Sequence, residues 1–230
     1  MDALLQCRDL DVHYGAFHAL KTVSTSVPPG QRVAVFGHNG SGKSTLLKAC
    51  VGVHPRIEGS VRFRDMEVLA GQVPRNAQLG IAFVPQSRNV FNDLSVERNL
   101  LIAGLKHDNV DLQPAWSIFP FLRHRRHQLA STMSGGEQQM LAFAMALMTK
   151  PSLLLLDEPT TGLSPAMANL VLDTVDRITK QLGIALMIVE QNVPRTLKVV
   201  DRALIMKGGR LVSDTPSADL VGRQDLWEWF

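Results

Sequence analysis

A glycine-rich turn in the first quarter of the chain reads Gly37-His38-Asn39-Gly40-Ser41-Gly42-Lys43-Ser44. It matches the pattern G-x-x-x-x-G-K-[ST], whose glycines let the backbone fold closely around phosphate oxygens. The apolar residues 32–36 before it predict a buried parallel strand, and residues 42 to about 51 predict a helix. The alternative is a glycine-rich turn that simply opens a helix. The strand before it and the helix after it favour a phosphate-binding loop, because loop amides and the helix N-terminus then face the anion.

Each polar side chain of this loop has an expected partner on a nucleotide. Lys43 is expected to reach the β- and γ-phosphates, Ser44 to ligate Mg²⁺, and Thr45 to bond the α-phosphate. His38 occupies a variable position of the loop and is expected to contribute a backbone donor. The sequence therefore predicts ATP and Mg²⁺ as cofactors, with nucleotide contacts from Gly37, His38, Asn39, Gly40, Ser41, Gly42, Lys43, Ser44 and Thr45.

A second polar group follows a run of four leucines at residues 153–156, which ends in Asp157 and Glu158. Ligands of open parallel sheets bind at the carboxyl ends of strands, so these side chains are expected beside the phosphate loop. Asp157 is then a metal ligand, and Glu158 is a general base for the attacking water. The alternative is an acidic turn after a buried strand, which the nearby phosphate loop makes less favourable.

Composition excludes several classes of protein. The chain has 230 residues, 45% of them hydrophobic, and a net charge of +3, which is ordinary for a globular protein and gives no strong electrostatic case for nucleic acid. Two cysteines, Cys7 and Cys50, indicate a reducing compartment and are expected as small buried residues. The longest apolar run, residues 140–148, is too short to span a bilayer, and the N-terminus does not resemble a signal peptide. We therefore expect a cytosolic protein that reaches a membrane only by docking.

The remaining pattern alternates strands and helices, which is typical of a parallel α/β sheet. Strands are expected at residues 4–10, 18–27, 79–84, 153–156, 184–189 and 203–206. Helices are expected at 96–105, 114–122, 136–148, 165–181 and 194–200. We expect one domain over 1–230, with a core lobe at about 1–86 and 150–230 and a helical subdomain at about 87–149.

Another anion-binding helix start is predicted at Ser134-Gly135-Gly136. One ATP does not need two such sites on one chain. Two chains that face each other would use both, with one site from each chain.

With these motifs in this order, the whole chain closely resembles the nucleotide-binding subunit of ATP-binding cassette (ABC) transporters. The resemblance implies an α/β P-loop NTPase fold with a mainly parallel core sheet, an N-terminal antiparallel β lobe and an inserted helical subdomain. It also implies that Ser134, Gly135 and Gly136 cap the γ-phosphate of a nucleotide held by the opposite chain.

The resemblance gives roles to further residues. Tyr14 falls where the family has an aromatic ring that stacks on adenine, although a packed core aromatic is the alternative. Gln86 falls where a glutamine links Mg²⁺ and the water to the membrane partner, although a solvated turn is the alternative. Residues 162–165 match a loop that touches the opposite subunit, and they would also cap a helix. Gln191 stands where the family normally has a histidine that contacts the γ-phosphate.

Residues 133–142, 162–165 and 189–192 resemble the smaller ATPase of branched-chain amino-acid importers. The dipeptide Gln86-Ser87 departs from that branch, which commonly has Glu-Gly there. The implied function is ATP hydrolysis that drives uptake of branched-chain or related amino acids. The alternatives are an importer of urea or short-chain amides, a soluble ABC-type ATPase acting on the ribosome or nucleic acid, and a non-hydrolysing ATP clamp.

The implied partners are a second ATPase subunit, identical or similar, and two transmembrane permease subunits. An extracytoplasmic substrate-binding protein would act indirectly, and no nucleic acid is expected. The implied location is the cytoplasmic face of the plasma (inner) membrane. A basic cluster at Arg123-His124-Arg125-Arg126-His127 is either a solvated helix end or a surface near lipid or the partner.

Overall fold

Two β-sheets and a group of helices make up the computed structural model, which describes residues 3–54, 56–87, 89–105 and 111–223. A four-stranded antiparallel sheet has the order β2-β1-β4-β5, and a six-stranded sheet has the order β10-β9-β3-β8-β7-β6. In the larger sheet β9, β3, β8, β7 and β6 run parallel, and β10 is the antiparallel edge. The bounds are β1 Leu5–Tyr14, β2 Phe17–Val27, β3 Arg32–Phe36, β4 Glu58–Phe63, β5 Met66–Glu67, β6 Ile81–Val84, β7 Leu153–Asp157, β8 Ala185–Val189, β9 Arg202–Lys207 and β10 Arg210–Pro216.

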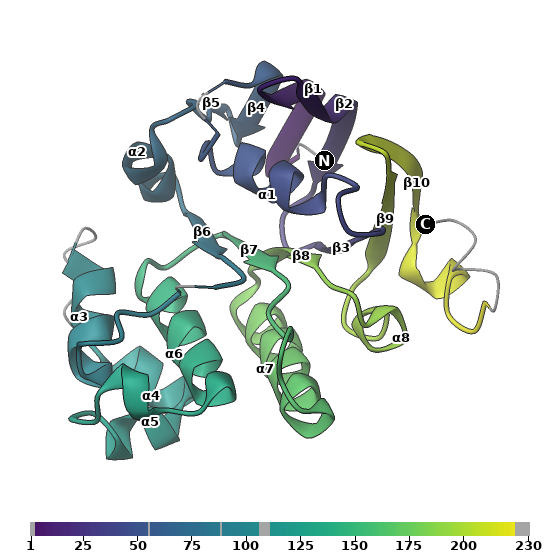
Figure 1. Ribbon diagram of the computed structural model, residues 1–230. Helices are drawn as coiled ribbons and strands as arrows, with labels where there is room; N and C mark the ends of the chain where they lie inside the picture. Colours follow the sequence, from purple (N-terminus) through teal and green to yellow (C-terminus); the bar gives the residue numbers. More distant parts are fainter. Residues whose placement is uncertain (1–2, 55, 88, 106–110, 224–230) are drawn as a thin grey trace.

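Figure 1 shows how the helices are arranged around the larger sheet. The helix α1 lies between the two sheets, and α3 to α6 gather beyond the β6 edge of the larger sheet. The bounds are α1 Lys43–Cys50, α2 Val73–Gln78, α3 Val96–Leu105, α4 Gln113–Ile118, α5 Pro120–His124, α6 Gly135–Met148, α7 Pro165–Leu182 and α8 Val193–Thr196. None of the helices in the described ranges is both long and apolar enough to cross a membrane.

The period-2 alternation of strand side chains builds two cores, one on each face of the larger sheet. In β7, Leu153 and Leu155 pack toward α1 and the antiparallel sheet, whereas Leu154 and Leu156 pack toward α6 and α7. Because both faces are covered, the strand is a continuous apolar run instead of an alternating one. This arrangement confirms the predicted fold class.

Several elements differ from the expectation. The helix expected at 114–122 is interrupted at Phe119, which lies outside the helical region at φ −126° and ψ 72°. The cause is Pro120, because proline disfavours helical geometry in the residue before it and starts a new helix readily. The sequence reasoning missed β4, β5, α2 and β10, and also two 3-10 helices at Ala130–Thr132 and Ser217–Asp219.

The missed helix α2 is tied to α1 by a buried asparagine. Asn76 is fully buried; its Oδ1 accepts from Leu69 N at 3.1 Å, and its Nδ2 donates to Leu69 O at 2.7 Å and Val51 O at 3.1 Å. One side chain thus satisfies three backbone groups in two connecting segments.

We expect Asn76→Ala to lower the free energy of unfolding by about 2 kcal/mol, because Leu69 N and Val51 O lose the hydrogen bonds from this side chain. Urea denaturation monitored by circular dichroism measures the change. Asn169→Ala, on the exposed side of α7, is the matched control and should change stability by less than about 0.5 kcal/mol. Equal stability of the two variants would contradict the structural role of Asn76.

Candidate functional site

The phosphate loop connects β3 to α1 and has a backbone that only glycine fits at two positions. Gly37 and Gly42 have φ of 148° and 103°. A Cβ on Gly37 would lie 2.3 Å from Met206 O, and one on Gly42 would lie 2.7 Å from Ala19 O. Both glycines are therefore required by positive φ and by close backbone approach.

Lys43 is the first residue of α1, and its side chain points back toward the phosphate loop. Its Nζ donates to Gly37 O at 2.8 Å and to His38 O at 3.0 Å. The residue is only 4% exposed. Burial lowers the pKa of Lys43, and the nearby Glu158 and Asp157 carboxylates oppose this shift.

Two features of the loop suit a phosphate. Ser41 Oγ is buried and has no hydrogen-bond partner among the described residues. A buried hydroxyl without a partner is costly, so an oxygen-rich ligand would satisfy it. The cavity at this loop has a volume of about 370 Å³ and also contains Asn39, Gly40 and Thr45. Six of the nine predicted loop residues line this cavity, whereas Gly37, His38 and Ser41 do not, and nucleotide binding by the loop stays a prediction.

Ser44 and Asp157 form the oxygen pair expected to hold a metal. Ser44 Oγ donates to Asp157 Oδ1 at 2.7 Å, which joins the start of α1 to the end of β7. Burial raises the pKa of Asp157, and the hydrogen bond from Ser44 and the nearby Lys48 lower it in part. One carboxylate and one hydroxyl beside a phosphate site match the oxygen ligands that Mg²⁺ prefers.

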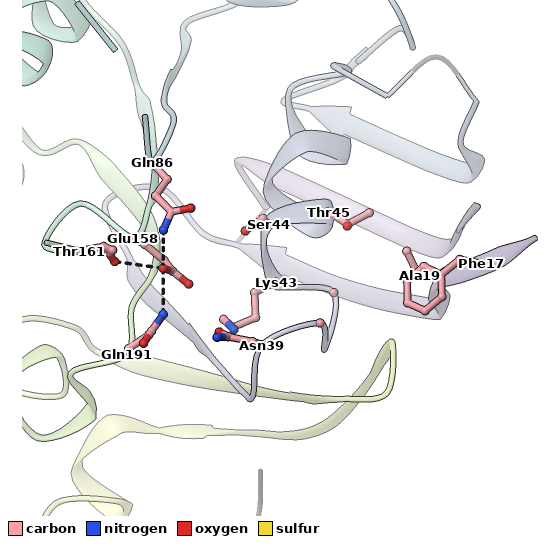
Figure 2. A pocket seen from close by; sticks show the side chains of 12 residues that line it. Phe17, Ala19, Asn39, Lys43, Ser44, Thr45, Gln86, Glu158, Thr161 and Gln191 are labelled. Carbon is pink, nitrogen blue, oxygen red and sulfur yellow. Dashed lines mark hydrogen bonds between the residues drawn. The ribbon is translucent and has the colours of Figure 1, made fainter. Parts of the chain in front are cut away.

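Glu158 lies in the same cavity, where three side chains converge on one of its oxygens (Figure 2). The acceptor is Oε2, and the donors are Gln86 Nε2 at 2.8 Å, Gln191 Nε2 at 2.9 Å and Thr161 Oγ1 at 3.0 Å. The other oxygen, Oε1, makes no hydrogen bond within the part of the chain that the structure describes. All three neutral donors hold the carboxylate in place without neutralising its charge.

Sequence reasoning named Gln86 and Gln191 but missed Thr161 and Phe17, which also line the cavity. Thr161 lies three residues after Glu158, so a helical-turn spacing was the available signal. Phe17 starts β2 and is 60% exposed. No feature of the sequence distinguishes it from an ordinary strand aromatic.

Tyr14 does not line the cavity that contains Lys43. It is 46% exposed and lies edge-on to His54, with ring centroids 4.7 Å apart, in a neighbouring cavity of about 1000 Å³. Adenine stacking by Tyr14 stays a prediction.

The Ser134 helix start also lies apart from the loop cavity. Ser134 caps α6, with Glu137 N donating to its Oγ at 3.4 Å and its own N donating to Glu137 Oε2 at 2.9 Å. Ser134 and Gly135 are exposed, whereas Gly136 packs so closely that a Cβ would lie 2.2 Å from Met167 Cε. The exposed end of α6 is thus free to meet another molecule.

The raised pKa of Asp157 predicts a pH-dependent gain in stability for Asp157→Asn. The folded carboxyl binds its proton more tightly than the unfolded one, so ionisation costs the folded state. That cost is complete above the folded-state pKa and disappears as the pH falls toward the ordinary value of 3.8. We expect the nucleotide-free variant to melt at a higher temperature than the unsubstituted chain at neutral pH, because the asparagine has no charge to bury.

Thermal melts of both proteins from pH 7 down to about pH 4 measure this difference, which should shrink with falling pH. A variant that melts below the unsubstituted chain at neutral pH would contradict the burial cost.

Comparison with known proteins identifies the family. The family model for ABC transporters matches residues 20–161. The chain is 39% identical to the high-affinity branched-chain amino acid transport ATP-binding protein BraG of Pseudomonas aeruginosa, over 95% of each chain. It is 37% identical to the probable branched-chain amino acid transport ATP-binding protein LivF of Archaeoglobus fulgidus, over 95% of this chain and 94% of that one.

The fold agrees with this family assignment. A crystal structure of a nucleotide-free ATP-binding cassette from an ABC transporter superimposes with a TM-score of 0.87 at 25% identity, covering 99% of this chain and 98% of that one. Sequence, fold and the phosphate loop therefore agree, and the chain belongs to the ABC transporter family as an ATP-binding subunit that hydrolyses ATP.

Proposed function

We propose that this chain is the ATPase of an ABC importer, which dimerises around ATP and Mg²⁺ to drive uptake of branched-chain or related amino acids. The observation that carries the transport role is the 39% identity to BraG over 95% of both chains. The relative from Archaeoglobus fulgidus supports the same cargo class. An importer of urea or short-chain amides is the alternative that the Gln86-Ser87 departure leaves open.

We propose that Glu158 is the general base and that Oε1 is the atom that accepts the proton of the attacking water. Its support is geometric, because Oε2 already accepts three hydrogen bonds and Oε1 accepts none within the described residues. A positioned carboxylate of this kind contributes about 10²–10⁴-fold to the rate of a hydrolysis.

Lys43 and the loop amides would bind the β- and γ-phosphates, and Thr45 the α-phosphate. Ser44 and Asp157 would hold Mg²⁺, with the Gln86 amide oxygen as a further ligand. When bound, the metal neutralises charge on the phosphates. Gln191 would contact the γ-phosphate as a neutral donor, and Tyr14 would stack on adenine.

The second chain would complete the site. Ser134, Gly135 and Gly136 lie outside the loop cavity of their own chain, and the first two are exposed. We propose that they cap the γ-phosphate on the opposite subunit, which is identical or similar. These charge-assisted bonds exist only in the closed pair, so ATP favours closure and hydrolysis favours opening.

Two permease subunits and, indirectly, an extracytoplasmic substrate-binding protein complete the proposed assembly. The chain would lie on the cytoplasmic face of the plasma (inner) membrane as a peripheral subunit. The helical group α3–α6 and the segment after Gln86 would transmit closure to the permease.

We expect Glu158→Gln to keep nucleotide affinity while its turnover falls by about 10²-fold or more. The carbonyl oxygen of the introduced amide would still accept the three hydrogen bonds, and the amide nitrogen would replace only the basic Oε1. Phosphate release measures turnover, and a fluorescent nucleotide measures binding. The contrasting variant is Lys43→Ala, which should lose at least about tenfold in affinity because the phosphates lose their buried cation.

Normal turnover in Glu158→Gln would remove Glu158 as the base. Unchanged affinity in Lys43→Ala would contradict the assignment of the phosphate loop.

A separate experiment tests the transport role. Cells that lack this chain should lose uptake of radiolabelled leucine, isoleucine and valine, and the unsubstituted gene should restore it, whereas Lys43→Ala should not. Loss of urea uptake alone would support the alternative cargo. Unchanged uptake together with association of the chain with ribosomes would overturn the importer proposal.

A further inference from the structure

Glu190 is a buried carboxylate beside the hydrolysis site that has no role in the function proposed above. It follows the last residue of β8 and is 2% exposed. Burial raises the pKa of Glu190, and hydrogen bonds from Thr160, Gln191 and Asn192 lower it in part. Within the described residues no lysine, arginine or histidine forms an ion pair with it. Burial of a carboxylate without a cation costs free energy, so the hydrogen bonds that Glu190 accepts indicate its role in the structure.

Two of those hydrogen bonds come from backbone amides in two different loops. Oε1 accepts from Thr160 N at 3.0 Å, in the loop after β7. Oε2 accepts from Gln191 N at 3.1 Å, in the loop after β8. Glu190 therefore joins the loop that contains Glu158 and Thr161 to the loop that contains Gln191.

The first of these loops needs support, because Glu158 has a φ of 46°. A non-glycine residue in the left-handed region costs of order 1 kcal/mol or more and persists only when its surroundings hold it. Glu158 N donates to Val189 O at 2.9 Å, and Thr161 N donates to Glu158 O at 3.2 Å. The hydrogen bond from Thr160 N to Glu190 Oε1 holds Thr160, which lies between Glu158 and Thr161 in this turn.

We propose that Glu190 is a positioning residue, which holds the turn at Glu158 and the backbone of Gln191 in the one arrangement where their side chains meet. The proposal rests on Glu158 being the general base. Glu190 does not line the cavity that contains Lys43, so it acts through Glu158 and Gln191.

A substitution of Glu190 should therefore lower kcat and leave nucleotide affinity unchanged. The phosphate loop comes from the β3–α1 connection, and the side-chain hydrogen bonds of Lys43 and Ser44 do not involve Glu190. Loss of the Glu190 contacts should therefore displace the base by a fraction of an ångström to an ångström while the phosphates stay bound, and small displacements of catalytic groups cost up to about 10²-fold in rate.

The experiment compares the unsubstituted chain with the variant Glu190→Gln. The substitution keeps size and shape, but it replaces one acceptor oxygen by an NH₂ group that faces a backbone N–H. We expect kcat for phosphate release to fall at least about tenfold, whereas the dissociation constant of a fluorescent ATP analogue stays within about threefold. The destabilised control is Asn76→Ala, which lies away from the site and should keep its kcat at a temperature where both variants are folded.

Amide hydrogen exchange gives a readout that does not depend on turnover. Thr160 and Gln191 amides should be protected in the unsubstituted chain and exchange faster in Glu190→Gln. The proposal is overturned if both amides exchange freely in the unsubstituted chain. It is also overturned if the variant keeps kcat within twofold, or if its affinity and kcat fall together.

Glu158→Gln separates this proposal from the function on which it rests. If Glu158→Gln is inactive and Glu190→Gln is fully active, only the role of Glu190 fails. If Glu158→Gln retains normal turnover, the assignment of the base fails first.

Discussion

The hydrogen bond from Glu158 N to Val189 O extends the parallel pairing of β7 and β8 one residue beyond the strand end. The site depends on this register. Because β7 and β8 pair with Asp157 opposite Val189, the residues that follow both strands emerge side by side. A slip of one residue would turn Asp157 away from Ser44 and remove the partners of Glu158, since alternate strand residues face opposite sides of the sheet. The four leucines of β7 prevent that slip by packing into a separate core on each face.

Burial of the charged groups Lys43 and Asp157 lowers the stability of the nucleotide-free protein. Burial moves the pKa of Lys43 down and that of Asp157 up, so each group is displaced toward its neutral form. Lys43 instead donates to the loop carbonyls, and Asp157 accepts from Ser44. The opposite charges near each group offset only part of this cost, since both pKa values stay shifted toward the neutral form. Functional sites often bury charged groups in this way, and the protein then loses some stability in return for its activity.

The sequence predicts the five parallel strands of the larger sheet and the phosphate loop because those elements carry strong patterns, such as Leu153–Leu156 and the motif ending at Ser44. It misses β5 and α2, since two and six residues are too short to show a period. The break at Phe119 was readable from Pro120. The meeting of Gln86, Thr161 and Gln191 on one oxygen was not, because it depends on how three loops lie in space. Glu190 was hidden for a related reason, as its partners are backbone amides, which every residue except proline has.

The donor at position 191 also affects how the base can work. A histidine there would change charge near neutral pH, whereas the Gln191 amide remains a neutral donor at every pH at which the protein is folded. Together with Gln86 and Thr161, it orients the Glu158 carboxylate without placing a cation against it. Neutral donors fix the direction of Oε1 and leave its negative charge available to a water molecule. The neutral donors thus orient the carboxylate, and Glu158 alone supplies the basic oxygen. For this to work, the loops that contain the donors must be held as firmly as Glu158 itself.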